Sequence, residues 1–202
     1  MDHAILDCLT QLIPQIYMLK TMTAPNAWKT LSERTVYENA WIRVREDRFV
    51  RPDGEGGTYG VIEIRPSVGI VAINARQEIV LIGQYRYTSK RYTWEIPRGG
   101  SAPEEQDLLA VAKRELREEA GVEAADWQSL GLVDVCNGVT TDVQHLFLAG
   151  QLSLVGAEPD AEEDLTVSWM PFAEAVRMVH SNEISEVCSI AAILKAQHLL
   201  ET

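Results

Sequence analysis

Alternating apolar and polar positions dominate the chain from about Leu31 to Tyr87. Runs such as TVYENAWIRVREDRFV, TYGVIEI, VGIVAI and IVLIGQYRY either alternate or concentrate β-branched residues. Alternation with a period of two gives a strand one apolar face, so these runs predict β-strands. The glycine-rich stretch from Pro52 to Gly57 and the segment from Asn74 to Gln77 predict turns between strands.

Helical periodicity first becomes strong in the middle of the chain. A helix is predicted from about Glu104 to Ala120, with Gly121 as its C-terminal cap. Further strands are predicted at residues 129–135, 144–152 and 165–170, and further helices at residues 172–180 and 185–200. This order of elements predicts the α/β (α+β) class, with a mixed-sheet sandwich rather than a doubly wound sheet.

The same pattern divides the chain into three parts. Residues 1–27 are expected to be a loosely attached extension, residues 28–65 a small antiparallel β subdomain, and residues 66–202 the main domain. The first segment is mildly apolar. Asp2 stands where a signal peptide has a basic start, however, and Pro14 interrupts the apolar stretch. No targeting sequence is therefore expected.

Composition narrows the class of function. The 202 residues are 46% hydrophobic and 24% charged, which suits a globular domain without a membrane span. A net charge of −12 argues against nucleic acid as a partner, because such binding requires clustered cations. Three cysteines, Cys8, Cys136 and Cys188, show neither disulfide nor zinc spacing, which favours a reducing cytoplasm.

Three carboxylates lie on one stripe of the central helix. Glu115, Glu118 and Glu119 are spaced i, i+3 and i+4, so they lie within one turn of each other. Like charges repel, and acids near a helix C-terminus each cost roughly 0.3–1 kcal/mol. A solvated acidic face, offset by Arg114 and Arg117, is the structural alternative.

Apolar residues on the same stripe favour a cleft over a solvated face. Leu108, Val111 and Ala112 lie on or beside the stripe one to two turns earlier. On such a helix face, the apolar end is expected to be buried in the core and the acidic end to open into a cleft. Carboxylates gathered there would bind a hard cation such as Mg²⁺ or Mn²⁺.

The helix sequence resembles the Nudix hydrolase family. That family has the signature Gly, five residues, Glu, seven residues, then Arg-Glu-U-x-Glu-Glu-x-Gly-U, where U is aliphatic. This chain has Arg114, Glu115, Leu116, Glu118, Glu119, Gly121 and Val122 in register. Counting back places Gly100 at the first position and Gln106 at the second, where the family has Glu. If counting begins instead at Gly99, Glu105 takes that position.

The resemblance implies a fold and a metal site. The fold is the Nudix α/β/α sandwich with a mixed sheet. Two to three Mg²⁺ or Mn²⁺ ions would be held by Glu115 and Glu119, by Glu118 as a ligand or as a partner of a ligand, and by the carbonyl of Gly99. Together they would bridge a diphosphate and activate water.

Catalytic groups also follow from the resemblance. Arg86 corresponds to an arginine that related enzymes aim at the phosphates, with a surface arginine as the alternative. Glu163, in the acidic segment before Leu165, is the expected general base. Glu118 or Glu115 can take that role instead, and the acidic loop can also be a plain connector.

WEIPRG, from Trp94 to Gly99, is similar to the ADP-ribose and nucleoside diphosphate sugar pyrophosphatase branch, although Arg98 stands where that branch often has Ala. In that branch an N-terminal sheet forms a domain-swapped homodimer, and aromatic residues stack on the base. Trp28 and Trp41 are therefore expected to bind substrate, together with Arg51, Arg86 and Arg98. The base and the sugar are not specified.

Two other functions remain open. The chain can be a Nudix hydrolase that acts on dinucleoside polyphosphates, coenzyme A or nucleoside triphosphates. It can also be a sensor that binds a nucleotide sugar without cutting it. The intact Glu115, Glu118 and Glu119 favour catalysis, whereas Gln106 favours the sensor.

Overall fold

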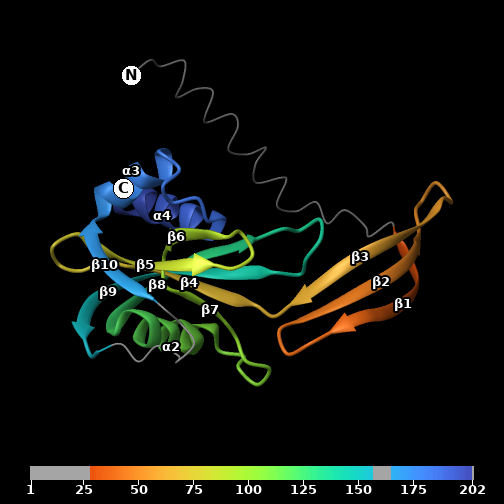
Figure 1. Ribbon diagram of the computed structural model, residues 1–202, viewed down its shortest axis with the longest axis horizontal. Coiled ribbons are helices and arrows are strands. Elements are labelled where there is room, and N and C mark those ends of the chain that lie inside the picture. Colours follow the sequence, from red (N-terminus) through yellow and green to blue (C-terminus); the bar gives the residue numbers. More distant parts are fainter. Residues whose placement is uncertain (1–27, 157–164, 202) are drawn as a thin grey trace, which may run out of the picture. The chain divides into compact units, whose positions relative to one another are not determined.

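The computed structural model describes residues 28–156 and 165–201 (Figure 1). Its strands are β1 (Lys29–Glu38), β2 (Ile42–Val50), β3 (Gly56–Ile64), β4 (Ser67–Ala72), β5 (Glu78–Arg86), β6 (Arg91–Glu95), β7 (Arg98–Gly100), β8 (Val122–Asp134), β9 (Val143–Leu154) and β10 (Thr166–Pro171). Its helices are α2 (Leu108–Ala120), α3 (Phe172–His180) and α4 (Val187–Leu200). None of these helices is long and apolar enough to cross a membrane.

The chain divides into two compact units. Among the described residues, the first comprises residues 28–35 and 45–60, and the second comprises residues 36–44, 61–156 and 165–201. The first unit contains part of a three-stranded sheet with the order β1-β2-β3. Trp28 packs there against Phe49, with ring centroids 4.5 Å apart, and Tyr59 meets both rings edge-on.

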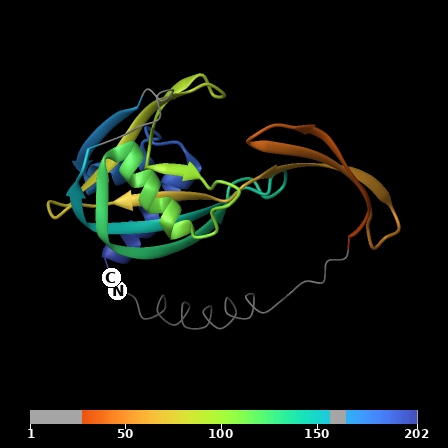
Figure 2. The same cartoon turned by 90° about the horizontal axis from the view of Figure 1, so that it is seen from below.

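Two sheets form the centre of the second unit, in the orders β10-β5-β6 and β7-β4-β9-β8. Strands β4 and β9 are parallel, whereas β4–β7, β5–β6, β5–β10 and β8–β9 are antiparallel. Helix α2 lies on one side of these strands, and α3 and α4 lie on the other (Figures 1 and 2). The α/β/α sandwich with a mixed sheet is confirmed.

Strand β4 shows why the sandwich has a core on each side. All six of its residues are buried, as expected for a strand covered on both faces. Val68 and Ile70 belong to the apolar cluster that includes Val111 and Leu116 of α2. Val71 belongs to the cluster formed with α3 and α4. The apolar contacts of α2 with β4 therefore hold the helix that carries Glu115 and Glu119.

The observed start of α2 differs from the prediction. The helix begins at Leu108, not near Glu104, because the Asp107 carboxylate caps it by accepting the backbone N–H groups of Leu109 at 3.0 Å and Ala110 at 3.3 Å. At the other end Gly121 has φ 66, the left-handed conformation expected of a C-terminal cap.

Other element boundaries differ for similar local reasons. Strand β8 begins at Val122 rather than at residue 129, since the left-handed Gly121 turns the chain directly into extended structure. Helix α4 begins at Val187 rather than at Ser185, because the Glu186 carboxylate accepts from the N–H groups of Cys188 and Ser189. The predicted helix at residues 172–180 coincides with α3.

Replacing the cap of α2 should lower stability. We expect Asp107→Ala to reduce the free energy of unfolding by about 0.5–2 kcal/mol, because two backbone N–H groups lose their acceptor. Asp107→Asn retains the acceptor and should stay close to the unmodified protein. Urea denaturation followed by circular dichroism measures the difference. Equal stability of the alanine and asparagine variants would show that the cap is not needed.

Candidate functional site

A cleft of about 450 Å³ opens beside the acidic end of α2. All of its walls belong to the second unit. It is lined by Trp41, Arg65, Arg98, Gly99, Gly100, Ser101, Ala102, Glu105, Arg114, Glu115, Glu118 and Glu119. The structure therefore brings the three glutamates of the predicted stripe together with the loop around β7.

Glu115 and Glu119 are held in the inner part of this cleft. Their exposed fractions are only 8% and 6%, which is unusual for carboxylates. The backbone N–H of Arg98 donates to Glu119 Oε2 at 2.9 Å. A Cβ atom at Gly99 would overlap the carboxylate of Glu115, so only glycine allows the β7 backbone to lie this close.

Arg114 compensates for the repulsion between the glutamates. Its Nη1 lies 2.8 Å from Glu115 Oε1 and 2.8 Å from Glu118 Oε2. Partial burial disfavours the charged guanidinium, but ion pairs with Glu105, Glu115 and Glu118 outweigh it and raise the pKa of Arg114. The arginine of the helix motif therefore remains a cation between two carboxylates.

Glu105, rather than Gln106, supports the loop before α2. Its Oε2 accepts the backbone N–H of Ala102 at 2.7 Å, and its Oε1 accepts from Arg114 Nε at 3.2 Å. The Ala102 N–H and then Arg114 lower the pKa of this carboxyl group. Gln106 is exposed. The structure therefore favours counting from Gly99, with one additional residue between Glu105 and Arg114.

A second cleft of about 350 Å³ shares Arg98 with the first. It is lined by Arg86, Thr88, Ser89, Arg91, Thr93, Glu95, Arg98, Ser185 and Glu186. Glu95 is only 1% exposed, and Arg86 binds it through both Nε at 2.9 Å and Nη2 at 2.5 Å. Burial alone would raise the pKa of Glu95, but hydrogen bonds from Arg86 and Thr93 lower it.

Arg98 is positioned by acids from two elements. Its Nη1 lies 3.5 Å from Glu95 Oε2 and 3.1 Å from Glu186 Oε1, the residue that caps α4. Neither Glu95 nor Glu186 was expected at the site from the sequence. An acid inside the apolar strand WEIP and an acid directly before an apolar helix are the signals that could have revealed them.

The other predicted site residues have different surroundings. Trp41 is 73% exposed and lines the glutamate cleft. Trp28 packs in the aromatic cluster of the first unit, and Arg51 pairs with Asp53 in the turn between β2 and β3. Neither of these two residues lines the glutamate cleft. Glu163 lies outside the described residues.

The donor set of the glutamate cleft suits a hard divalent cation. Two buried carboxylates and a more exposed third supply oxygen ligands, which Mg²⁺ and Mn²⁺ prefer. Within residues 28–156 and 165–201, no three acidic, histidine or cysteine side chains are arranged at metal-ligating spacing. Arg114 links Glu115 to Glu118, so a cation bound between these carboxylates would have to displace its guanidinium.

Glu105 and Gln106 form a matched pair for testing the loop. We expect Glu105→Ala to weaken Mn²⁺ binding by about 10- to 100-fold, a range typical for the loss of a group that orients metal ligands. Gln106→Ala should change the affinity less than twofold, because its exposed side chain orients no ligand. Electron paramagnetic resonance of free Mn²⁺ measures both. A larger loss of Mn²⁺ affinity in the Gln106 variant would favour counting the motif from Gly100, with Gln106 at the position of the family's glutamate.

Comparisons with known proteins support the same interpretation. Residues 28–62 match the nucleoside diphosphate sugar hydrolase N-terminal domain, and residues 63–189 match the NUDIX domain. The ADP-ribose pyrophosphatase of Mycobacterium tuberculosis is 36% identical over 182 residues, which cover 89% of this chain and 87% of that protein.

Two further proteins show the range of this similarity. A CMP-5'-(N-acetyl-N-hydroxy-3-aminopropyl)phosphonate hydrolase of Streptomyces rubellomurinus is 27% identical over 154 residues, covering 76% of this chain and 74% of its own. The crystal structure of an ADP compounds hydrolase superposes with a TM-score of 0.78 at 22% identity, covering 87% and 95% of the two chains. The fold, the NUDIX match over most of the chain and the relative at 36% identity show that the chain belongs to the Nudix family and is a Nudix hydrolase.

Proposed function

We propose that this chain hydrolyses the diphosphate bond of a nucleoside diphosphate sugar, with ADP-ribose as the first candidate. The products would be a nucleoside monophosphate and a sugar phosphate. The observation behind this proposal is that Arg98 lines both the glutamate cleft and the arginine-lined cleft. A diphosphate that lies beside Arg98 can face metal-binding carboxylates on one side and guanidinium groups on the other. The names of the relatives support the same bond type.

Nudix hydrolases use divalent metals in general, and we propose two to three Mg²⁺ or Mn²⁺ ions here. Glu115, Glu119 and the Gly99 carbonyl would hold them, with Glu118 as a ligand or a partner of a ligand. When bound, the ions would neutralise diphosphate charge and lower the pKa of an attacking water. The burial of Glu115 and Glu119 supports this assignment, because buried carboxylates gain most from a cation.

Arg86 and Arg98 would orient the phosphates. Glu95 holds Arg86 by two hydrogen bonds, which fixes the plane of the guanidinium. The Arg86 side chain is still 38% exposed, so part of it remains available to an anion in the second cleft. This arrangement supports a role in positioning the diphosphate rather than a purely structural ion pair.

Glu163 remains our proposed general base, and Glu118 is the alternative within the described cleft. The Glu118 side chain is 42% exposed, which makes it the most accessible carboxylate of the stripe. Its Oε2 accepts a hydrogen bond from Arg114 Nη1 at 2.8 Å, which positions the carboxylate in the cleft. A loss of rate in Glu163→Gln that exceeds the loss in Glu118→Gln would favour Glu163.

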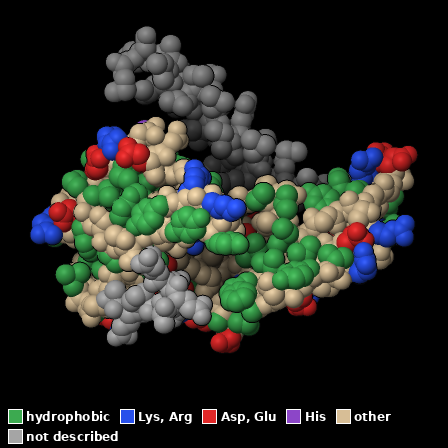
Figure 3. All heavy atoms as spheres, viewed as in Figure 1, with side chains coloured by type: hydrophobic (Ala, Val, Ile, Leu, Met, Phe, Trp, Pro, Cys, Tyr) green, Lys and Arg blue, Asp and Glu red, His purple; other side chains and the backbone are tan. Residues whose placement is uncertain are grey.

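The β1–β3 sheet supports a proposal of homodimerisation. Several of its large apolar side chains are exposed, and Figure 3 shows apolar side chains on the visible face of these strands. Exposed apolar groups gathered on one surface are typical of an interface. We propose a domain-swapped homodimer, in which Trp28 or Trp41 stacks on the base of the substrate.

A substrate screen tests the reaction. Purified protein with Mg²⁺ and a phosphatase that reports monophosphate products would be offered ADP-ribose, GDP-mannose, diadenosine polyphosphates and nucleoside triphosphates. We expect turnover of nucleotide sugars, reduced at least about 100-fold in Glu119→Gln because the buried ligand loses its charge. Preference for triphosphates or polyphosphates would reject the proposed substrate class. Binding without any turnover would identify a sensor.

Stacking of the base on Trp41 has its own signature. We expect Trp41→Ala to raise the KM for ADP-ribose about 5- to 150-fold at nearly constant kcat, as expected for loss of ~1–3 kcal/mol of stacking. Trp41→Phe keeps an aromatic face and serves as the control. An unchanged KM in Trp41→Ala, with an increase in Trp28→Ala, would move the base site to Trp28.

A further inference from the structure

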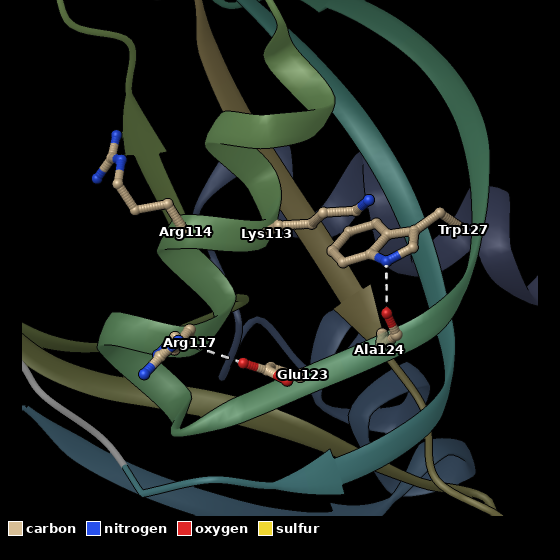
Figure 4. Close-up of a pocket in the computed structure, with 6 residues that line it drawn as sticks. All are labelled: Lys113, Arg114, Arg117, Glu123, Ala124 and Trp127. Atoms are coloured by element: carbon tan, nitrogen blue, oxygen red, sulfur yellow. Dashed lines mark hydrogen bonds and ion pairs between the residues drawn. The ribbon is translucent and has the colours of Figure 1, made fainter.

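A pocket of about 450 Å³ lies on the side of α2 that faces β8. It is lined by Lys113, Arg114, Arg117, Glu123, Ala124 and Trp127 (Figure 4). Its volume is within the range of about 300–1,000 Å³ that is usual for small-molecule sites. Arg114 is the one residue common to this pocket and the glutamate cleft. In Figure 4 its guanidinium points away from Lys113 and Trp127.

The Trp127 ring is fixed at one wall of this pocket. Its indole N–H donates to the carbonyl oxygen of Ala124 at 2.9 Å (Figure 4). Its ring meets Phe147 nearly edge-on, with centroids 6.2 Å apart and planes at 78°. The polar atom of the indole is therefore satisfied inside the protein. The half-buried ring can offer an incoming ligand only its apolar surface.

Two cations face the same space from α2. Lys113 and Arg117 are four residues apart, which places them on one face of the helix, and both are exposed. Arg117 pairs with Glu123 at 3.3 Å, and both of these side chains are 52% exposed. Lys113 makes no side-chain hydrogen bond or ion pair within the described part of the chain. Like charges at this spacing repel, and one carboxylate offsets only one of them.

The local charge is opposite to that of the whole chain. The chain carries a net charge of −12, yet the pocket has three cationic side chains and one carboxylate. Arg114 forms ion pairs with Glu105, Glu115 and Glu118 in the glutamate cleft. Lys113 and Arg117 are therefore the cations that face a ligand, with Arg117 shared with Glu123. An anion would relieve their repulsion, whereas a cation or neutral apolar ligand would not.

We propose that this pocket is an accessory binding site for a mononucleotide. The base would pack against Trp127, and the phosphate would lie between Lys113 and Arg117. Aromatic stacking combined with cations is the usual means of binding a nucleotide without reading its base. The internally satisfied indole N–H supports this lack of base selectivity. The proposal does not depend on the substrate of the glutamate cleft, because Lys113, Arg117 and Trp127 do not line that cleft.

Nuclear magnetic resonance can test this site with AMP as the probe. The full-length ¹⁵N-labelled protein would be titrated without divalent metal, and the Trp127 indole N–H signal would be assigned from Trp127→Phe. We expect a saturable shift of that signal. Its dissociation constant should increase at least about tenfold in Lys113→Ala/Arg117→Ala. It should stay unchanged in Glu119→Gln.

Matched controls distinguish specific binding in this pocket from nonspecific attraction of AMP to surface cations. Arg76→Ala/Lys195→Ala removes the same charge from exposed positions elsewhere in the second unit and should leave AMP binding unchanged. Inorganic phosphate and adenosine should each bind at least about tenfold more weakly than AMP. Hydrolysis by Lys113→Ala/Arg117→Ala should equal that of the unmodified protein.

Three outcomes would overturn the proposal. The first is a Trp127 signal that AMP does not move. The second is an affinity that the Lys113/Arg117 variant does not lower. The third is phosphate binding as tight as AMP binding, which would leave no role for the aromatic wall. If the Trp127→Phe variant fails to fold, backbone assignment of residues 113–127 provides the same local readout.

Discussion

Charge compensation around the acidic face of α2 is the constraint on which the second unit depends. Glu115 and Glu119 are buried, and buried carboxylates without partners would destabilise the fold. The Arg114 guanidinium and the Arg98 backbone N–H provide those partners. The Arg98 contact requires that the β7 backbone lies close to the helix, which only Gly99 allows. The helix, the loop and the glycine therefore form one interdependent unit.

Pairing of acidic and basic groups also links the two sides of the sandwich. Arg98 binds Glu119 through its backbone, and Glu95 and Glu186 through its side chain. Glu119 belongs to α2, and Glu186 caps α4 on the opposite layer. The two helical layers are thus joined through a single arginine at the edge of the sheets. Substrate binding at Arg98 would act on a residue that also holds the scaffold together.

The sequence predicted the features that depend on local periodicity. The acidic stripe of α2 and the extent of α3 follow from spacing along one helix, and both are present in the structure. Partners that depend on strand register were missed. The register of β5 and β6 pairs Arg86 with Arg91 and Glu95 with Ile82, so Arg86 reaches Glu95 along the strands rather than directly across them. No pattern within either strand specifies that contact. The start of α2 was misplaced because the helix-favouring Glu104 and Glu105 concealed the cap at Asp107.

The extra residue between Glu105 and Arg114 has a broader consequence for how this motif can evolve. An insertion before the cap at Asp107 lengthens only non-helical chain, and a long glutamate side chain can still reach across it. An insertion within the helix would rotate every later residue by about 100° and turn the carboxylates away from the cleft. Insertions and deletions are therefore tolerated before the cap at Asp107 but not within the helix that follows it. Searches for distant relatives should allow a variable gap ahead of the helix and a rigid one inside it.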